Sequence, residues 1–376
     1  MQLKEKQSTM SKSKRIGLKP TEEERKMDAQ MQSNHTLRLK NIKLERQVKE
    51  ANAHKRIVES ALEKTEQQLE IISGILGYEE YSKTTRKIIS PDFRHKNEAT
   101  AFILLSDIHG DEEVTLETTN GWNKSNPDIT VMKLNTFREG LLKTVREMRK
   151  GISIPHLVFG ILGDTITGYI HEENLENNLM SPTQGIMMIK PILIDTIKTF
   201  SEDGDFKSIK VIMIRGNHGR TTKKKRYSTA YKNSYEWQMY IDIATVFREQ
   251  LVGYDNVEFF IPKSFMEEIE VYGKKITFSH GDHWNYRGGI GGVEIPMRSW
   301  SYREQKAAPA DRRYFGHWHT WTPGKETING SCVGYNPFAM EKGFEPEPPL
   351  CHFELLDRNR SMFTVKLPII LHNLYK

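Results

Sequence analysis

The sequence has few of the features that mark secreted or membrane proteins. Among 376 residues there are only two cysteines, Cys332 and Cys351. They are too few for a disulfide framework or a thiolate zinc cage, and we expect both to be small core residues. No apolar run approaches the roughly 18 residues that a bilayer span needs, and the N-terminus lacks the order of a secretory signal. These absences predict a cytoplasmic protein with no membrane partner.

The positive charge of the chain is unevenly distributed. The formal net charge is +6, and residues 1–98 carry 21 Lys and Arg against 15 Asp and Glu. Residues 99–376 carry 34 of each, so the whole surplus is N-terminal. The first 19 residues contain six basic residues and one acid. We therefore predict a basic, disordered arm over residues 1–35, which suits an anionic partner.

A heptad pattern follows the arm. Positions at alternating steps of four and three are apolar at Leu37, Leu44, Val48, Ala51, Val58, Leu62, Leu69, Ile72 and Leu76, and polar at Asn41, Lys55 and Thr65. The pattern predicts a helical or coiled-coil segment over residues 36–78, followed by a polar linker over 79–98. Two copies could pair into a homodimer through this stripe, or one helix could pack it on its own subunit. The sequence leaves both possibilities open.

From residue 99 onward, short apolar runs alternate with helical stretches, which is typical of a layered α/β domain. Residues 102–106, 157–162, 209–214 and 276–279 have the pattern of buried strands. Helical spacing covers residues 128–150 and 235–251. Because such sheets place functional loops beyond the carboxyl ends of their strands, those ends are the places to search for a site.

Metal-ligating residue types follow the predicted strands and the segment 312–315. They are Asp107, His109, Asp164, Asn217, His280, His317 and His319. Imidazole and carboxylate together suit Mn²⁺, Fe²⁺ or Zn²⁺, whereas Ca²⁺ and Mg²⁺ prefer sites that are nearly all oxygen. The set is too large for one catalytic ion that keeps an open position, so it predicts two divalent ions with Asp164 able to bridge them.

Such a centre predicts phosphoryl chemistry. Two divalent ions outweigh two carboxylates and one hydroxide, so the centre would stay positive and attract a phosphate. A hydroxide bridging both metals would attack phosphorus in line with the leaving oxygen. His218, next to Asn217, is then placed to protonate the leaving group.

Residues 102–336 resemble the calcineurin-like metallophosphoesterase superfamily. Its five blocks Asp-x-His, Gly-Asp, Gly-Asn-His, His and Gly-His-x-His occur here in order. The resemblance implies an α/β fold, a four-layer αββα sandwich, over residues 99–376. It also implies one metal on Asp107, His109, Asp164 and His319, and another on Asp164, Asn217, His280 and His317. His218 matches the proton donor of the superfamily.

Two positions depart from the pattern of the superfamily. Gly219 stands where an acid commonly follows Gly-Asn-His, and Thr167 stands where the Gly-Asp block often has a second Asp. The missing acid would help to orient His218. Asp111, Asp282 or Glu172 could take its place.

A basic segment directly follows His218. Residues 215–235 contain seven basic residues and no acid. We expect substrate contacts from Arg220, Lys223, Lys224, Lys225, Arg226 and, near the fourth block, His283. Interleaved aromatics, among them Tyr227, Tyr231, Tyr235, Trp237, Trp284, Tyr286, Trp318 and Trp321, favour a polynucleotide channel. The alternative is a solvated basic loop beside core aromatics.

The combined pattern resembles nucleases that process DNA ends in double-strand-break repair and, more loosely, phosphoesterases of bacteriophages and their hosts. We therefore predict a hydrolase dependent on two divalent ions, with Mn²⁺ favoured over Fe²⁺ or Zn²⁺. Its expected activity is that of a DNA nuclease, either exo- or endonuclease. One alternative is a phosphodiesterase or phosphomonoesterase for nucleotides or another small phosphoester. Another is a nucleic-acid-binding assembly protein with a weak or inactive site.

Overall fold

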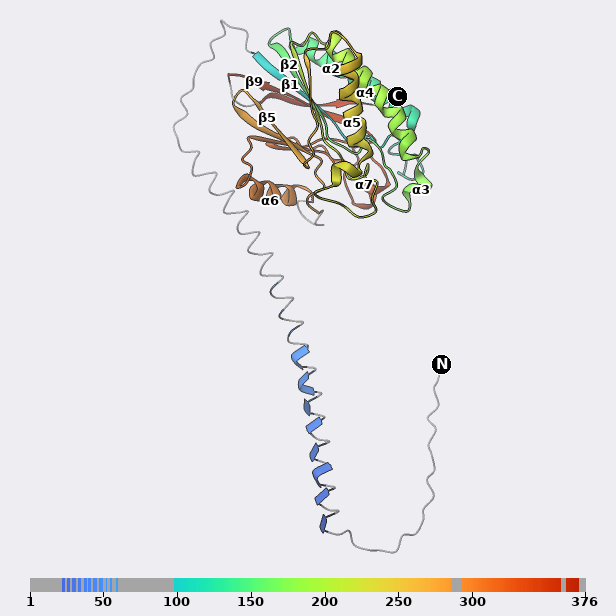
Figure 1. Ribbon diagram of the computed structural model, residues 1–376, viewed down its shortest axis with the longest axis vertical. Coiled ribbons are helices and arrows are strands. Elements are labelled where there is room, and N and C mark those ends of the chain that lie inside the picture. Colours follow the sequence, from blue (N-terminus) through green and yellow to red (C-terminus); the bar gives the residue numbers. More distant parts are fainter. Residues whose placement is uncertain are drawn as a thin grey trace. The chain divides into compact units, whose positions relative to one another are not determined.

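The computed structural model describes residues 98–285, 292–359 and 363–371, and single positions between 22 and 59. The chain divides into two compact units, Met1–Lys87 and Ile88–Lys376. In the first unit the described positions are helical and exposed, starting at Glu22 within the segment 1–35 (Figure 1). The heptad residues Leu37, Leu44 and Val48 are among them, and each is more than half exposed. The remaining heptad positions lie outside the described residues.

The second unit contains two β-sheets. The larger sheet has the strand order β10 (Phe363–Ile370), β9 (Leu350–Asp357), β1 (Glu98–Leu105), β2 (Ser153–Ile161), β3 (Ser208–Met213) and β4 (Val257–Phe260). The smaller sheet has the order β5 (Met266–Val271), β6 (Lys274–Ser279), β7 (Arg312–Phe315) and β8 (Glu326–Ile328). Strands β1 to β4 are parallel, as are β6 to β8, whereas β5, β9 and β10 join by antiparallel pairing.

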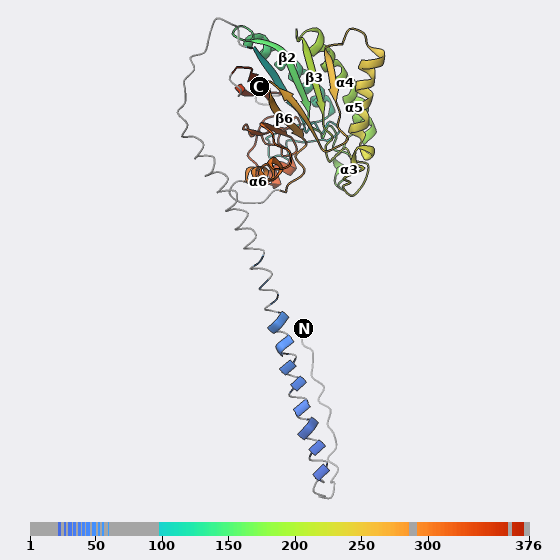
Figure 2. The same cartoon turned by 60° about the vertical axis from the view of Figure 1, so that its left-hand side comes forward.

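Helices cover the outer face of each sheet (Figures 1 and 2). The long helices α2 (Pro127–Met148), α4 (Pro182–Glu202) and α5 (Tyr235–Thr245) lie against the larger sheet, and α5 continues into a π-helical turn, Val246–Gln250. Helix α6 (Glu294–Gln305) lies against the smaller sheet, and α3 (Asn174–Asn177) and α7 (Pro337–Glu341) are short.

Local sequence signals explain where the two longest helices begin. The Asn126 side chain accepts a hydrogen bond from the Ile129 N–H ahead of α2, and Ser181 forms a reciprocal capping box with Gln184 ahead of α4. Both helices carry proline in their first turn, where a backbone N–H would have no intrahelical acceptor.

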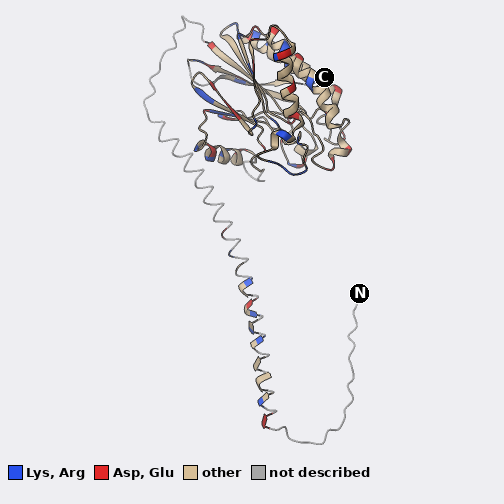
Figure 3. Cartoon of the chain, in the orientation of Figure 1, with Lys and Arg blue, Asp and Glu red and all other residues tan. Residues whose placement is uncertain are grey.

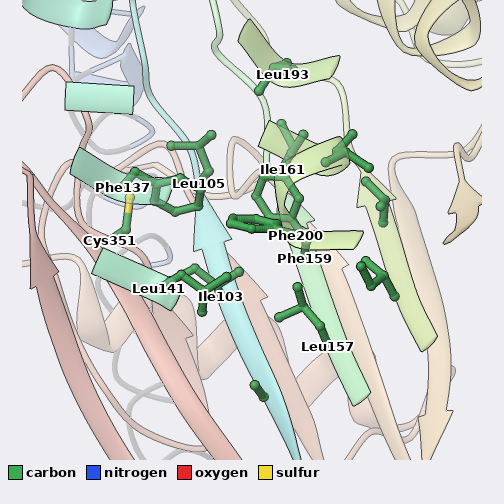
Figure 4. Packing of buried hydrophobic residues seen from close by; sticks show 14 of the residues in the cluster. Ile103, Leu105, Phe137, Leu141, Leu157, Phe159, Ile161, Leu193, Phe200 and Cys351 are labelled. Carbon is green, nitrogen blue, oxygen red and sulfur yellow. The ribbon is translucent and has the colours of Figure 1, made fainter. Parts of the chain in front are cut away.

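Alternating residues of β1 define the layers. Ile103 and Leu105 point toward the helices, on the side where Phe137 of α2 lies, and Phe200 of α4 packs on Phe159 of the neighbouring strand β2 (Figure 4). Phe102 and the other residues of even number in β1 point to the smaller sheet, because successive side chains of a strand face opposite ways. The structure is therefore the four-layer αββα sandwich that the sequence resemblance implies.

The predicted elements are present with shifted ends. The segments expected to form strands overlap β1, β2, β3 and β6, the segment 312–315 is β7, and the two expected helices are α2 and α5 with its π-helical turn. Helices α3, α4, α6 and α7 and strands β4, β5, β8, β9 and β10 were not predicted. Cys332 and Cys351 are free and buried, as expected.

Acidic and basic side chains are interspersed on the helices of the second unit (Figure 3). Among the described residues, no helix combines the length and apolar character needed to cross a bilayer.

Candidate metal centre

The carboxyl ends of strands from both sheets meet at one edge of the sandwich. Hydrogen bonds between backbone and side-chain groups join them there. The backbone N–H of His317, just after β7, donates to both carboxylate oxygens of Asp107, just after β1, at 3.0 Å. Nδ1 of His280, just after β6, lies 2.6 Å from the carbonyl oxygen of Leu162, just after β2. Residues that follow four different strands are thereby brought into one site, and Asn217, after β3, joins them because its Oδ1 lies 2.9 Å from Nε2 of His280.

Three of the predicted ligands form a first group. The ligand atoms of Asp107, His109 and His319 lie within 4.8 Å of one another. Nε2 of His319 is 3.5 Å from Oδ1 of Asp107, and the rings of His109 and His319 are 5.2 Å apart. All three side chains are buried. This group has the donor set that a borderline divalent ion prefers.

The other predicted ligands lie around Asp164. Asp164, His280 and His317 form a second group within the same 4.8 Å limit. Nε2 of His280 lies 2.9 Å from Oδ2 of Asp164 and 2.9 Å from Oδ1 of Asn217. All seven predicted ligands thus occur in or beside two adjacent groups. The bridging role of Asp164 stays a prediction, because the distances place its carboxylate in the second group.

The hydrogen bonds of the histidines fit metal binding. Nδ1 of His109 lies 3.0 Å from the Thr167 hydroxyl, and its buried Nε2 has no hydrogen-bond partner among the described residues. Nδ1 of His319 is likewise buried without a partner there. A buried, unpaired ring nitrogen is costly unless something binds it. Metal-binding histidines commonly use one nitrogen for an orienting hydrogen bond and the other for the metal.

The two buried carboxylates of this site also favour a bound cation. Although burial lowers the pKa of His280, the carboxylates of Asp164 and Asp107 raise it to about 10. Burial, together with the charge of His280, lowers the pKa of His317 to about 3. Protonated His280 therefore compensates the two carboxylates, while His317 stays neutral. A divalent ion would supply this compensation more fully and would use both imidazoles as ligands.

Backbone strain is concentrated at the ligands. Asp107, His109, Asp164, His317 and His319 have φ between 45° and 72°, in the left-handed region. Residues other than glycine rarely adopt this conformation, which costs of order 1 kcal/mol or more per residue. Five predicted ligands share it, which marks this edge as a functional site.

His218 is held beside the first group. Its N–H donates to Oδ1 of Asp164 at 2.8 Å, and its Nδ1 lies 2.8 Å from the Thr167 carbonyl oxygen. The ring stands edge-on to that of His109, with centroids 4.9 Å apart. Because a carbonyl oxygen can only accept, Nδ1 donates its proton to Thr167. Nε2 is the nitrogen left to exchange a proton with a substrate.

Two acids, Asp111 and Glu236, lie near the two positions at which the sequence departs from the superfamily pattern. Asp111 accepts the N–H groups of Thr167 and Gly168 at 2.5 and 3.1 Å, and so holds the carbonyl group that orients His218. Thr167 itself supplies the hydroxyl group next to His109. Asp111 therefore acts on His218 through the backbone, rather than by direct contact. Of the other two candidates, Asp282 pairs with Lys225 and Glu172 is exposed.

Glu236 of α5 is a site residue that sequence reasoning missed. It is fully buried and accepts the N–H of Thr165 at 2.5 Å, the hydroxyl of Thr165 at 2.9 Å and the N–H of Gly216 at 2.6 Å. Burial and the nearby Asp164 raise its pKa to about 7. A Cβ on Gly219 would lie 2.5 Å from Cγ of Glu236. An acid from a distant helix thus occupies the space beside the third block, and position 219 must stay small.

A cavity of about 670 Å³ opens beside Asn217 and His280. Four of the six predicted substrate residues line it: Arg220, Lys225, Arg226 and His283. The other two, Lys223 and Lys224, are exposed and lie outside its lining.

Two of the lining cations hold the loop in place. Nζ of Lys225 lies 2.7 Å from Oδ2 of Asp282, and the Arg220 guanidinium donates to the carbonyl oxygens of Asn217 and Thr222 at 3.0 and 3.1 Å. Arg226, by contrast, is exposed, and no interaction partner is found for it among the described residues. The segment is therefore anchored at Arg220 and Lys225, while Lys223, Lys224 and Arg226 are exposed.

The aromatic residues that were expected to contact a polynucleotide are mostly structural where they are described; Tyr286 lies outside the described residues. Trp284 and Trp318 are 7% and 4% exposed and belong to the core beneath α6. Trp237 packs on Tyr231, and Tyr227 is the exposed member that lines the cavity. Phe265 and Trp300 also line it and were missed, because they lie in segments with no other sign of a site.

Comparisons with known proteins add likenesses of fold. No protein-family model and no curated protein matches the sequence. Among solved structures, a predicted phosphoesterase from Streptococcus pneumoniae TIGR4 is 14% identical with a TM-score of 0.26, covering 72% of this chain and 97% of its own. Vps29 from Entamoeba histolytica, complexed with Zn²⁺, is 11% identical with a TM-score of 0.28, covering 72% and 99%. A 5′-nucleotidase from Candida albicans SC5314 is 12% identical with a TM-score of 0.32, covering 74% and 53%. At these values the matches carry no functional argument.

The two ligand groups predict two metal ions per chain. Dialysis against Mn²⁺ followed by elemental analysis should find two equivalents in the wild type. His109→Ala, in the first group, and His317→Ala, in the second, should each retain about one. His171→Ala is the matched control, because this exposed ring lies 5.8 Å from that of His218 but belongs to neither group. Equal metal content in all four proteins would contradict the assignment.

The contact between Gly219 and Glu236 predicts a coupled pair. Gly219→Ala should lower the free energy of unfolding by about 1–3 kcal/mol, because its Cβ would overlap the Glu236 side chain. In a Glu236→Ala background the same change should cost at least about 0.5 kcal/mol less. Urea unfolding followed by circular dichroism measures both. Gly151→Ala is the control, because nothing lies within 4 Å of its added Cβ; additive penalties would refute the coupling.

Proposed function

We propose that this protein is a metal-dependent phosphoesterase that hydrolyses phosphodiester bonds, with DNA as its leading substrate. The observation that carries the proposal is the pair of carboxylate and histidine groups next to a cavity with a cationic lining. Each group offers one carboxylate and two imidazoles. Two bound divalent ions would activate a water molecule and stabilise charge on the phosphoryl oxygens.

The residues around the centre would recognise a phosphate by charge. Asp107 and Asp164 carry too little negative charge to neutralise two divalent ions, so a loaded centre favours an anionic ligand. Arg220 and Arg226 line the adjoining cavity and add positive charge on the side of entry. Burial of the ligands excludes water and strengthens these interactions.

His218 is our candidate for the proton donor. The Thr167 carbonyl group accepts a hydrogen bond from the His218 ring, and the Asp164 carboxylate accepts one from the His218 backbone N–H. Protonated at both nitrogens, His218 could give the proton on Nε2 to the leaving oxygen while Nδ1 stays bonded to Thr167. Asp111 supports this arrangement because it holds the Thr167 backbone.

One observation favours the second candidate function, a phosphodiesterase or phosphomonoesterase for a small ester. Arg220 and Lys225 are engaged within the protein, so the segment offers fewer cations to track a long nucleic-acid backbone than its composition indicates. A nucleotide-sized phosphoester needs only the cavity and the centre.

The N-terminal unit is our candidate for attachment to DNA. It holds the whole charge surplus of the chain, including the six basic residues of the first 19. Pairing of two copies through residues 36–78 would double the number of arms and raise their avidity. Both the DNA partner and the homodimer stay predictions.

The proton-donor role predicts an effect that depends on the leaving group. With Mn²⁺, His218→Ala should lower kcat on labelled DNA by about 100-fold or more, because an alkoxide leaves poorly without a proton. It should lower kcat on bis(p-nitrophenyl) phosphate only a few-fold, since nitrophenolate needs no proton. His171→Ala is the matched histidine control, and the double variant Asp107→Ala, His109→Ala gives the background rate. A similar loss on both substrates would refute the role.

The charge of the arm predicts a defect in binding without a defect in chemistry. Glutamine in place of Lys4, Lys6, Lys12, Lys14, Arg15 and Lys19 should weaken DNA binding and flatten its salt dependence by about 0.9 in log–log slope for each DNA phosphate that the arm no longer neutralises. Fluorescence anisotropy at several salt concentrations measures both. Hydrolysis of bis(p-nitrophenyl) phosphate should be unchanged. An unaltered salt slope would show that the arm does not bind DNA.

A further inference from the structure

The cavity beside the metal centre is lined by aromatic rings as well as by polar and charged groups. In addition to Asn217, His280, Tyr227 and the cations, three further rings line it: those of Phe265, His283 and Trp300. They come from the segment before β5, the segment after β6 and helix α6, so their meeting is a product of the fold. None of the three is explained by the binding of metal or phosphate.

The rings form a compact cluster with an accessible side. The centroids of Phe265 and His283 are 4.6 Å apart, and those of His283 and Trp300 are 5.3 Å apart with planes inclined at 35°. Phe265 is 44% exposed. Phe265 also lines the cavity, so its exposed area is available to a ligand there.

The cluster is rigidly supported from behind. Trp300 packs on Trp284 and Phe315 at centroid distances of 5.6 and 5.8 Å, and both of these residues belong to the buried core under α6. Nδ1 of His283 lies 3.3 Å from Oδ1 of Asp282, which is itself held by Lys225. Because the platform is preformed, a ligand that stacks on it loses little free energy to ordering side chains.

The distribution of chemistry in the cavity matches one class of ligand. A nucleotide combines a phosphate, which suits the metal centre and the cations, with a flat aromatic base, which suits ring stacking. Asn285 also lines the cavity, and its amide can both donate to and accept from the edge of a base. The volume of about 670 Å³ lies within the roughly 300–1,000 Å³ of small-molecule sites.

We infer that Phe265, His283 and Trp300 form a stacking site for the base of a nucleotide whose phosphate lies at the metal centre. This inference rests on the proposed phosphoesterase function and specifies its substrate class. The nucleotide is either the end of a DNA strand or a free nucleotide ester, because both present the same base and phosphate. A phosphoester without a base would occupy the phosphate site alone.

The test compares two esters with the same leaving group. Wild type, Phe265→Ala and Tyr302→Ala are assayed with Mn²⁺ on the p-nitrophenyl ester of thymidine 5′-monophosphate and on ethyl p-nitrophenyl phosphate, which has no base. Tyr302 is a matched control, because it is 40% exposed on α6 but lies outside the lining of the cavity. Phe265→Ala should lower kcat/KM on the thymidine ester about 5- to 150-fold, the range of base stacking on an aromatic ring. It should leave the ethyl ester unchanged.

Further measurements separate the possible outcomes. Equal effects of Phe265→Ala on both esters, or none on either, would overturn the stacking site while leaving the phosphoesterase function intact. If the wild type cleaved neither ester, the proposed function would fail. Calorimetric titration of the wild type and Phe265→Ala with thymidine 5′-monophosphate and with inorganic phosphate would then still test stacking. The stacking site requires that Phe265→Ala weaken the binding of thymidine 5′-monophosphate and leave the binding of inorganic phosphate unchanged. The higher wild-type kcat/KM between a DNA oligonucleotide and a thymidine dinucleotide, which share an alkoxide leaving group, identifies the source of the nucleotide.

Discussion

Two buried carboxylates of like charge, those of Asp107 and Asp164, impose the central constraint on this structure. Neither is more than 1% exposed, so each needs compensation from the protein or from a bound ion. Backbone N–H groups of His317 and His218 supply part of it. The chain adopts left-handed backbone conformations at several ligands around these donors. It also needs glycine at position 216, where a Cβ would lie 2.0 Å from Oδ1 of Asp164. The histidines complete the compensation, and their remaining nitrogens are available to cations.

The order of the metal-binding blocks could be predicted from the sequence because each block follows a strand. Parallel strands bring their carboxyl ends to a common edge, so residues such as Asp107, Asp164 and Asn217 had to converge once the strands were recognised. The layered architecture followed from the same alternation of strands and helices. Helix α4 was harder to recognise, because its apolar residues form two short continuous runs, 186–189 and 192–194, with Pro191 between them in the helix interior.

The rest of the site depends on tertiary packing that local patterns do not encode. Glu236 lies on α5, well beyond the third block, and the only sign of it in the sequence is the glycine at position 219. Trp284 and Trp318 have the composition expected of stacking residues but fill the core, whereas Phe265 remains partly exposed. Lys225 belongs to a basic run but pairs with Asp282. Composition shows that charges and rings are present, and only the fold decides which of them face a ligand.

The centre is built from residues far apart in the chain, and this has a consequence for how the protein matures. The contact between the His317 N–H and the Asp107 carboxylate spans 210 residues, and that between Nδ1 of His280 and the Leu162 carbonyl spans 118. Contacts between residues so far apart in the sequence form late in folding, since the intervening chain must be ordered first. A chain still emerging from the ribosome would hold Asp107 and His109 but lack His319. Neither complete group can exist until both sheets have assembled, so metal loading would be a late event that follows folding of the domain.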